Sequence, residues 1–474
     1  MADEARTEDL ARAGAAGAAG ADGDGDADAT GASTGAGEMR RSPTVEAAFA
    51  LLVVASVGER LWFTRHSWFY LDDWPLALQA RHLGDFVDPY NGHLSVVLLG
   101  IYRSQMELFG FGSYLPLRVS GALSFAGVGV AVYLALRSRR GSVVAAVGAL
   151  PLVWFRNMTL EPAALNHYLS VVGGVGCAYL LSRRSSRRVD LSLGVALAFS
   201  LAAAGSGVAV AAACFVHVAC TRAPWRRWIA VALPTLCWGL WWLRYVGDPP
   251  LPGNATPADG LGDLARTVAS NVVGSFQQLA LGNRVVGVVL LVLFVARGAV
   301  LARQGLSGAA GFLAWSAALV TWWLGLALSR GTGAIPSQEF RYAFVAAGFI
   351  VIALVPAGPR TETARDPLHL GSRWAARVPS TVAVVIVLVV GAFLAVMVRG
   401  DVERSSHDLA QAGCVAHLSV VMVDRVPPVV DGDAVMPITM YLLPASQVRT
   451  LTDAYGHPFG RTQSAVKAVE DDCT

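Results

Sequence analysis

Long hydrophobic runs separated by polar connections dominate the chain from residue 43 to residue 398. Each run holds close to the ~20 apolar residues that an α-helix needs to cross a bilayer. The pattern predicts about eleven membrane-spanning helices. Their expected positions are 45–63, 115–136, 141–156, 162–181, 191–206, 207–221, 228–246, 284–302, 309–328, 342–357 and 380–398. The break at Gly205-Ser206-Gly207 allows either a tight hairpin between two helices or a kink in one helix.

The first long connection, residues 64–114, is predicted to hold helices that lie in the membrane interface. Leu94 to Phe109 is apolar but is interrupted by Arg103 and Glu107, which suits an interfacial helix better than a span. Pro75 to Leu83 is expected to form a second, shorter one. A later connection, residues 247–282, begins Pro-rich and continues as an amphipathic stretch.

The two ends of the chain differ from the hydrophobic middle. Residues 1–42 are rich in Ala, Gly and Asp and have little to bury, so we expect a disordered acidic tail. Residues 399–474 alternate apolar stretches with Pro and Asp turns, which predicts a small α/β region. If that region is extracytoplasmic, a disulfide between Cys414 and Cys473 is expected.

Composition and the distribution of arginine support a polytopic membrane protein. Charged residues make up 15% of the chain and hydrophobic residues 54%, whereas soluble proteins carry about 25% charged residues. With the N-terminus in the cytoplasm, the cytoplasmic connections receive the densest arginine clusters. These clusters are 137–140, 183–188, 222–227, 297–303 and 360–377. The same rule places residues 64–114 and the C-terminus outside a cell membrane.

Several function classes find no support in the sequence. It contains no phosphate-binding P-loop, no dinucleotide-binding glycine motif and no nucleophile elbow. No basic patch interleaved with aromatic residues suggests nucleic-acid binding. The six cysteines show no spacing typical of a zinc site, and we assign no metal ligands.

The adjacent carboxylates of Asp72 and Asp73, just after the first predicted helix, are the main candidates for catalysis. Acidic residues close to lipid are costly and usually functional. A partly desolvated carboxylate suits a general base that removes a proton from a hydroxyl group. The alternative is that one of the two caps the short helix beginning at Trp74-Pro75.

Other polar residues near the predicted outer surface are candidates for binding substrate. Arg341 offers a planar fork suited to phosphate, and the neighbouring Glu339 and Tyr342 are grouped with it. The remaining candidates are Asn91, His93, Arg103, Glu161 and His167. For Arg341 the alternative is an interface anchor, for His93 a capping or surface position, and for His167 local packing.

The chain resembles the GT-C superfamily of membrane glycosyltransferases, of an actinobacterial type. The resemblance rests on Asp72-Asp73-Trp74 after the first span, Asn91-Gly92-His93-Leu94, Gly112-Ser113-Tyr114-Leu115-Pro116 and Glu339-Phe340-Arg341-Tyr342. It implies an all-α polytopic fold in residues 43–398 and a sugar donor carried on polyprenyl phosphate. It also implies a catalytic acid in the first outer loop, with Asp73, or failing that Asp72, as the general base. The acceptor is a glycan, lipid or protein, and a divalent metal ion is left open as a cofactor.

In the implied reaction the acceptor hydroxyl attacks the anomeric carbon and inverts it in one displacement. Arg341, together with His93, stabilises the departing phosphate.

Two other interpretations remain. A transporter or flippase for a lipid-linked substrate would place ionisable groups near mid-membrane, whereas here they gather at helix ends and in outer loops. The other is a non-catalytic membrane protein of envelope assembly.

Overall fold

The computed structural model describes residues 42–67, 69, 72–90, 92–155, 162–245, 260–330, 340–354, 379–425, 435–436 and 443–455. The chain divides into Met1–Arg41 and Ser42–Thr474, and every described residue belongs to the second unit. The predicted acidic tail, residues 1–42, therefore lies outside the described residues except for its last position.

The described residues are mostly helical. The helices are α3 (Pro43–Phe63), α4 (Asp73–Gln79), α5 (Val96–Phe109), α6 (Leu115–Arg140), α7 (Ser142–Val153), α8 (Pro162–Leu181), α9 (Arg187–Ala203), α10 (Ser206–Cys220), α11 (Trp225–Tyr245), α12 (Leu261–Leu279), α13 (Arg284–Ala302), α14 (Leu306–Arg330), α15 (Phe340–Ala353), α17 (Ser380–Arg425) and α18 (Ala445–Tyr455). Two 3₁₀ turns, η1 (Thr64–His66) and η2 (Leu83–Val87), lie in the first loop. Strand β1 (Val435–Met436) pairs antiparallel with β2 (Leu443–Pro444).

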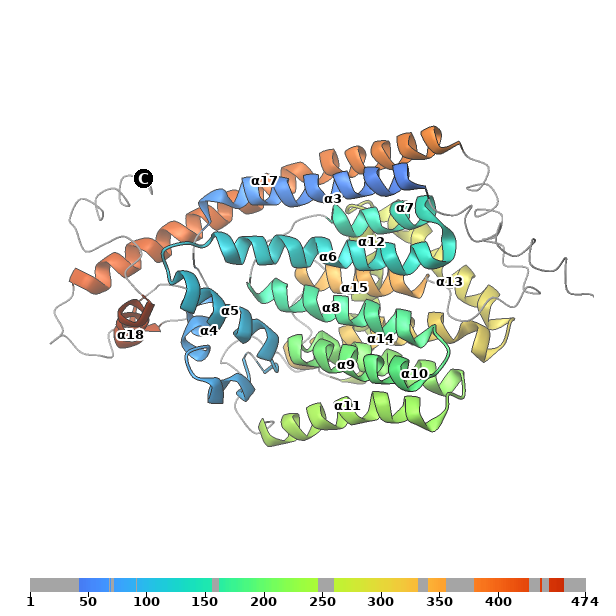
Figure 1. Cartoon of the computed structure of the whole chain (residues 1–474), viewed down its shortest axis with the longest axis horizontal. Helices are drawn as coiled ribbons and strands as arrows, with labels where there is room; N and C mark the ends of the chain where they lie inside the picture. Colours follow the sequence, from blue (N-terminus) through green and yellow to red (C-terminus); the bar gives the residue numbers. More distant parts are fainter. Residues whose placement is uncertain are drawn as a thin grey trace, which may run out of the picture. The chain divides into compact units, whose positions relative to one another are not determined.

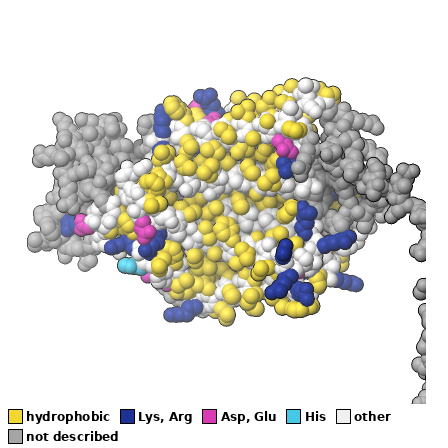
Figure 2. All heavy atoms as spheres, viewed as in Figure 1, with side chains coloured by type: hydrophobic (Ala, Val, Ile, Leu, Met, Phe, Trp, Pro, Cys, Tyr) yellow, Lys and Arg dark blue, Asp and Glu magenta, His cyan; other side chains and the backbone are white. Residues whose placement is uncertain are grey.

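Each predicted membrane segment coincides with a helix, and the long helices run alongside one another in Figure 1. Within the described residues, five helices are long and apolar enough to cross a membrane. These are Leu115–Ser138, Ala164–Leu181, Arg284–Ala302, Leu306–Ser329 and Ser380–Arg404. Figure 2 shows a largely hydrophobic surface, with charged side chains gathered toward the ends of the helices. The all-α membrane architecture is therefore confirmed, while the count of eleven crossings stays a prediction.

The segment around Gly205 forms a hairpin between two helices. Helix α9 ends at Ala203, Ala204 is extended with φ −162° and ψ 165°, and α10 begins at Ser206. A Cβ atom added to Gly207 would lie 2.5 Å from the carbonyl oxygen of Ser200. The close return of the chain thus needs glycine at position 207, and the alternative of one kinked helix is excluded.

Helix α17 continues past the predicted end of the membrane domain at residue 398. It runs unbroken from Ser380 to Arg425 and packs along α3. No proline occurs between Ser380 and Arg425 to stop the helix, and Arg399 forms a 2.9 Å ion pair with Glu403 one turn later. Residues 399–425, which we expected to begin a mixed α/β region, are therefore helical, and the strands are only two residues each.

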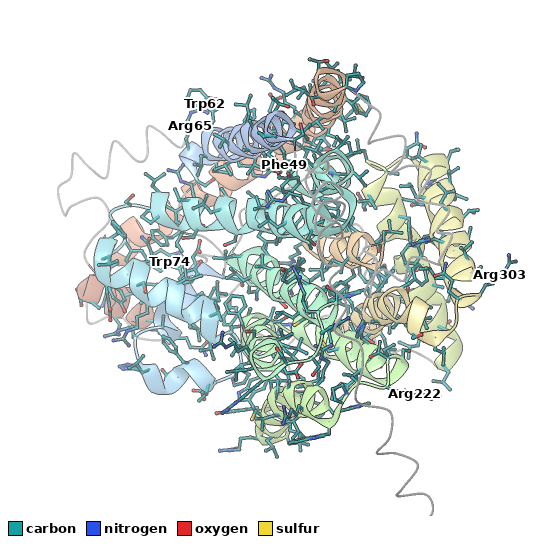
Figure 3. The ribbon with its side chains drawn as sticks, turned by 45° about the vertical axis from the view of Figure 1, so that its right-hand side comes forward. Phe49, Trp62, Arg65, Trp74, Arg222 and Arg303 are labelled. Carbon is teal, nitrogen blue, oxygen red and sulfur yellow. The ribbon has the colours of Figure 1, made fainter. Side chains whose placement is uncertain are left out.

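The first loop forms the two short helices expected from the sequence, α4 and α5, at the end of the bundle shared with α18 (Figure 1). Val448 and Leu451 of α18 belong to the same buried cluster as Trp74 of α4. In Figure 3, Trp74 lies on the side of the molecule away from Arg222 and Arg303. The C-terminal segment thus helps to hold the loop that carries the paired carboxylates.

Candidate active site

Asp73 is the first residue of α4, and its side chain is completely buried. One carboxylate oxygen accepts a hydrogen bond from the Tyr102 hydroxyl of α5, and the other accepts one from the Tyr114 hydroxyl at 3.1 Å. The carboxylate is therefore held between the two helices that follow it in the chain.

Tyr102 stays protonated in this arrangement. Burial, and then the nearby negative charge of Asp73, raise the pKa of the Tyr102 phenol well above its usual value of 10.0. A phenol that keeps its proton donates to the carboxylate across the physiological pH range. Tyr102 and Tyr114 thus fix the orientation of Asp73 without carrying a charge of their own.

Aromatic stacking holds α4 in position around this carboxylate. The ring of Trp74 stacks on Phe111 with centres 4.8 Å apart, and Phe69 meets the edges of Phe111 at 4.9 Å and Tyr114 at 4.8 Å. All four rings are buried. Aromatic pairs of this geometry contribute about 0.5–1.5 kcal/mol each beyond burial. They therefore stabilise the position of α4, although this helix has only seven residues.

Asp72 occupies the position before α4 and is only partly buried. Its side chain makes no capping hydrogen bond to the helix, so the capping alternative does not account for it. Its carbonyl oxygen accepts a 3.4 Å hydrogen bond from the Tyr90 hydroxyl. Tyr90 in turn pairs with His93 through two backbone hydrogen bonds of 2.9 Å. Tyr90 therefore links the backbone of Asp72 to the backbone of His93.

His93 contacts the hairpin between α9 and α10. A Cβ atom added to Gly205 would lie 2.7 Å from Nδ1 of His93, so the imidazole rests directly on the glycine backbone. The next residue, Ser206, lies within hydrogen-bonding distance of His167 on α8, with 3.3 Å between Oγ and Nδ1. The hairpin thus brings the first-loop histidine toward the buried histidine of α8.

His167 lies against two aromatic residues from later helices. Its ring centre is 5.3 Å from that of Trp322 on α14 and 5.9 Å from that of Tyr342 on α15. The guanidinium of Arg341, which is partly buried, lies 5.0 Å from the ring centre of Tyr342. A continuous series of contacts, which we call the Asp72–Arg341 path, therefore joins the first loop to α15. It consists of Asp72, Tyr90, His93, Gly205, Ser206, His167, Tyr342 and Arg341.

The described contacts of Arg103 lie outside the Asp72–Arg341 path. It forms a 2.7 Å ion pair with Glu107 on the same helix and donates a 3.2 Å hydrogen bond to the carbonyl oxygen of Arg81. These contacts link α5 to the loop after α4, and a role for Arg103 in binding substrate stays a prediction.

Several predicted site residues lie outside the described residues, namely Asn91, Glu161, Glu339 and Cys473. Cys414 falls within α17, but its side chain is not among those described. Within the described residues, no group of three His, Cys, Asp or Glu side chains is arranged to hold a metal ion.

Sequence reasoning did not assign Tyr102 and Tyr114 as the hydrogen-bond donors to the Asp73 carboxylate. Tyr102 lies on the face of α5 that also buries Leu98, Leu99, Gln105 and Met106, at spacings of three or four residues. A residue with a polar tip on an otherwise apolar buried face requires a polar partner. The spacing of apolar residues around Tyr102 is therefore the feature of the sequence from which a buried polar partner could have been predicted.

Comparisons with known proteins give a likeness of fold. No family model and no curated protein matches the sequence. The crystal structure of ArnT from Cupriavidus metallidurans bound to undecaprenyl phosphate is similar over 91% of this chain and 88% of ArnT, with a TM-score of 0.51 and 14% identity. This chain has the ArnT fold. The all-α membrane architecture expected from the sequence agrees with this fold.

Two further structures are similar at lower scores. ArnT from the same organism in the apo state gives a TM-score of 0.49 at 14% identity, covering 86% of this chain and 88% of ArnT. The apo oligosaccharyltransferase of Archaeoglobus fulgidus gives 0.44 at 10% identity, covering 81% of this chain and 58% of that enzyme.

Proposed function

We propose that this protein is a membrane glycosyltransferase that moves a sugar from a polyprenyl-phosphate donor to an extracytoplasmic acceptor hydroxyl. The observation that carries the proposal is the Asp72–Arg341 path, which connects the backbone of an acidic residue in the first loop to a cation at the start of α15. The fold shared with ArnT, which was crystallised with undecaprenyl phosphate, supports the choice of donor.

The burial of the two carboxylates favours Asp72 as the general base. A base must reach the proton that it removes, and Asp72 is partly exposed whereas Asp73 is fully buried. In this assignment Asp73, fixed by Tyr102 and Tyr114, positions the start of α4 and so orients Asp72. We therefore propose Asp72 before Asp73 as the general base, whereas the sequence alone favoured Asp73.

The reaction is a single displacement at the anomeric carbon. Asp72 takes the proton of the acceptor hydroxyl as its oxygen bonds to that carbon, and the bond from the carbon to the phosphate oxygen breaks. The phosphate leaves with the electron pair, and the configuration inverts. Arg341, with His93 on the same path, stabilises the charge that develops on the phosphate. Cleavage of the bond between the sugar and the phosphate supplies the energy for transfer.

The proposed site faces the extracytoplasmic side, with the N-terminus in the cytoplasm. Arg222 and Arg303, from two of the arginine clusters, lie on the side of the molecule away from Trp74 (Figure 3). That separation supports the positive-inside orientation and a site at the outer leaflet. The Cys414–Cys473 disulfide remains a proposal for the same compartment.

The direct test of the base is transfer from a radiolabelled polyprenyl-phosphate sugar by the purified full-length protein. Asp72→Asn should lower turnover by about 10²–10⁴-fold, the usual contribution of general base catalysis. Asp263→Asn is a matched control, because Asp263 pairs with Arg266 on α12 and lies outside the path. Wild-type turnover in both Asp72→Asn and Asp73→Asn would rule out both carboxylates as the base.

The test of the cation uses two replacements of Arg341. Lysine keeps the charge but loses the planar fork, whereas glutamine loses both. If Arg341 binds the leaving phosphate, turnover should fall in the order wild type, Arg341→Lys, Arg341→Gln. Equal turnover in all three would show that Arg341 serves only as an interface anchor.

A further inference from the structure

A polar pocket lies on the face of α4 that points away from Asp73. At about 100° per residue, Leu78 and Gln79 lie roughly 120–140° around the helix from Asp73. Both line a cavity of about 370 Å³ formed by α4, the η2 turn and α18. Pockets that hold small organic ligands have volumes of about 300–1,000 Å³. The cavity is therefore large enough for a small ligand and separate from the buried Asp73 carboxylate.

The side chains around this pocket offer both hydrogen-bond donors and acceptors. Its polar lining consists of Gln79, Arg81, His82, Asp85, Asp88 and Gln447. Carboxylates accept hydrogen bonds, a guanidinium donates them, and an amide such as that of Gln447 does both. Two acids, one arginine and one histidine nearly balance in charge. Such a mixed and nearly neutral lining matches the hydroxyl groups of a sugar, each of which donates and accepts.

The walls of the pocket are held in place by residues outside it. The Tyr245 hydroxyl on α11 donates a 3.0 Å hydrogen bond to Oδ1 of Asp88, and the Trp241 indole donates a 2.5 Å hydrogen bond to the carbonyl oxygen of Val87. Within the pocket, Gln79 Nε2 donates to the carbonyl oxygens of Asp85 and Asp88 at 2.9 and 3.0 Å. These bonds fix the backbone of the turn and the Asp88 carboxylate in one geometry, as a preorganised site requires.

The pocket adjoins the Asp72–Arg341 path. Asp88 and Pro89 line the pocket, and the next residue, Tyr90, bonds to the carbonyl oxygen of Asp72. From this continuity and the mixed lining, we infer that the pocket binds a neutral saccharide, the part of the acceptor that does not react. The identification of the saccharide as the acceptor rests on the proposed glycosyltransferase function, whereas saccharide binding itself does not.

Binding is tested on the full-length protein in detergent with three neutral probes, methyl α-mannopyranoside, methyl β-galactopyranoside and methyl α-arabinofuranoside. Saturation-transfer NMR should detect saturable binding of at least one of them. Asp85→Asn should weaken it by about tenfold or more, because a hydrogen bond to a charged group is lost. Gln447→Ala, a second variant on α18, should weaken it several-fold. Asp263→Asn should bind as the wild type does.

The outcomes separate this inference from the proposed function. Asp72→Asn should lose transfer yet bind the glycoside with unchanged affinity, because Asp72 does not line the pocket. Retained transfer in Asp72→Asn together with glycoside binding that Asp85→Asn weakens would contradict the base and leave the saccharide pocket standing. The saccharide-binding proposal would be overturned if no probe bound to the wild type. It would also be overturned if Asp85→Asn and Gln447→Ala both bound the probes as tightly as the wild type does. Displacement of the glycoside by inorganic phosphate would also overturn it, in favour of an anion site.

Discussion

Two buried carboxylates near helix N-termini, Asp73 and Asp190, are held in different ways. Asp190 in the first turn of α9 accepts a 2.9 Å hydrogen bond from the Arg227 guanidinium, and the two side chains are only 5% and 6% exposed. Arg227 also donates to the carbonyl oxygens of Leu181 and Arg183. The described donors to Asp73 are instead the neutral phenols Tyr102 and Tyr114.

The difference separates a structural charge from a candidate functional one. An arginine cancels the charge of its carboxylate, and such a pair tolerates burial while doing no chemistry. The phenols of Tyr102 and Tyr114 orient Asp73 by hydrogen bonds, and beside it a second carboxylate, Asp72, is partly exposed. We therefore expect changes at Asp190 to affect stability and changes at Asp72 to affect turnover.

The largest effect is expected from Asp72→Asn. Turnover with a lipid-linked sugar should fall by about 10²–10⁴-fold, while the thermal unfolding temperature stays near that of the wild type because Asp72 makes no side-chain cap. Turnover and thermal unfolding of one purified sample give both quantities. A large fall in unfolding temperature would instead give Asp72 a structural role.

Asp190→Ala should show the opposite behaviour. The change leaves the buried Arg227 guanidinium without its carboxylate, which costs about 3–5 kcal/mol. Thermal unfolding should therefore shift strongly, while turnover per folded molecule remains. The double variant Asp190→Leu/Arg227→Met, which removes both charges, should recover much of the loss; failure to recover would argue against an unpaired charge as the cause.

Tyr102→Phe should destabilise the first loop by about 1.5–3 kcal/mol, because the buried carboxylate loses a hydrogen bond. The raised pKa of Tyr102 also predicts a pH dependence with a definite sign. Its contribution is fully present below pH 10.0, the usual phenol value, and is lost as the pH rises through the raised pKa. Unfolding followed from pH 7 to 11 should show a steeper alkaline loss for the wild type than for Tyr102→Phe, and parallel curves would contradict this.

Gly205→Ala should affect turnover moderately. The added Cβ atom would lie 2.7 Å from His93 Nδ1, so the imidazole must move. If His93 helps to bind the donor phosphate, KM for the lipid-linked sugar should rise more than kcat falls. Gly239→Ala is the control, since a Cβ atom there meets nothing within 4 Å. An unchanged KM in Gly205→Ala would place His93 outside donor binding.

Arg103→Ala should have the smallest effect. The Arg103–Glu107 pair is 30% and 52% exposed, and such pairs contribute about 0–1 kcal/mol. Turnover should stay near that of the wild type, with a slight fall in unfolding temperature. A loss of turnover comparable to that of Asp72→Asn would return Arg103 to the binding site.

The sequence predicted most of the helices because the membrane segments form continuous hydrophobic runs. Hydrophobic runs located the long helices, and the stretch interrupted by Arg103 and Glu107 forms the 14-residue helix α5. The second part of α17, residues 399–425, was not predicted as helix because polar residues after Arg399 resemble the end of a span. A polar sequence still continues a helix when no proline stops it and pairs such as Arg399–Glu403 favour it.

The candidate site was only partly predictable for a different reason. Adjacent carboxylates are visible in a sequence, but which of the two is buried depends on where Tyr102 and Tyr114 fall after folding. Likewise, the approach of His93 to Gly205 joins residues more than 100 positions apart, and no local pattern reports it. The chemistry of the side chains was thus enough to choose the candidate residues. Their arrangement became known only from the packing of the helices.

The most direct test of the account is the structure of the full-length protein bound to undecaprenyl phosphate. We expect the phosphate to contact the Arg341 guanidinium and to lie beside His93, with the Asp72 carboxylate facing the same space. A phosphate bound in the arginine cluster at residues 222–227, or out of reach of Arg341 and Asp72 together, would contradict the central claim.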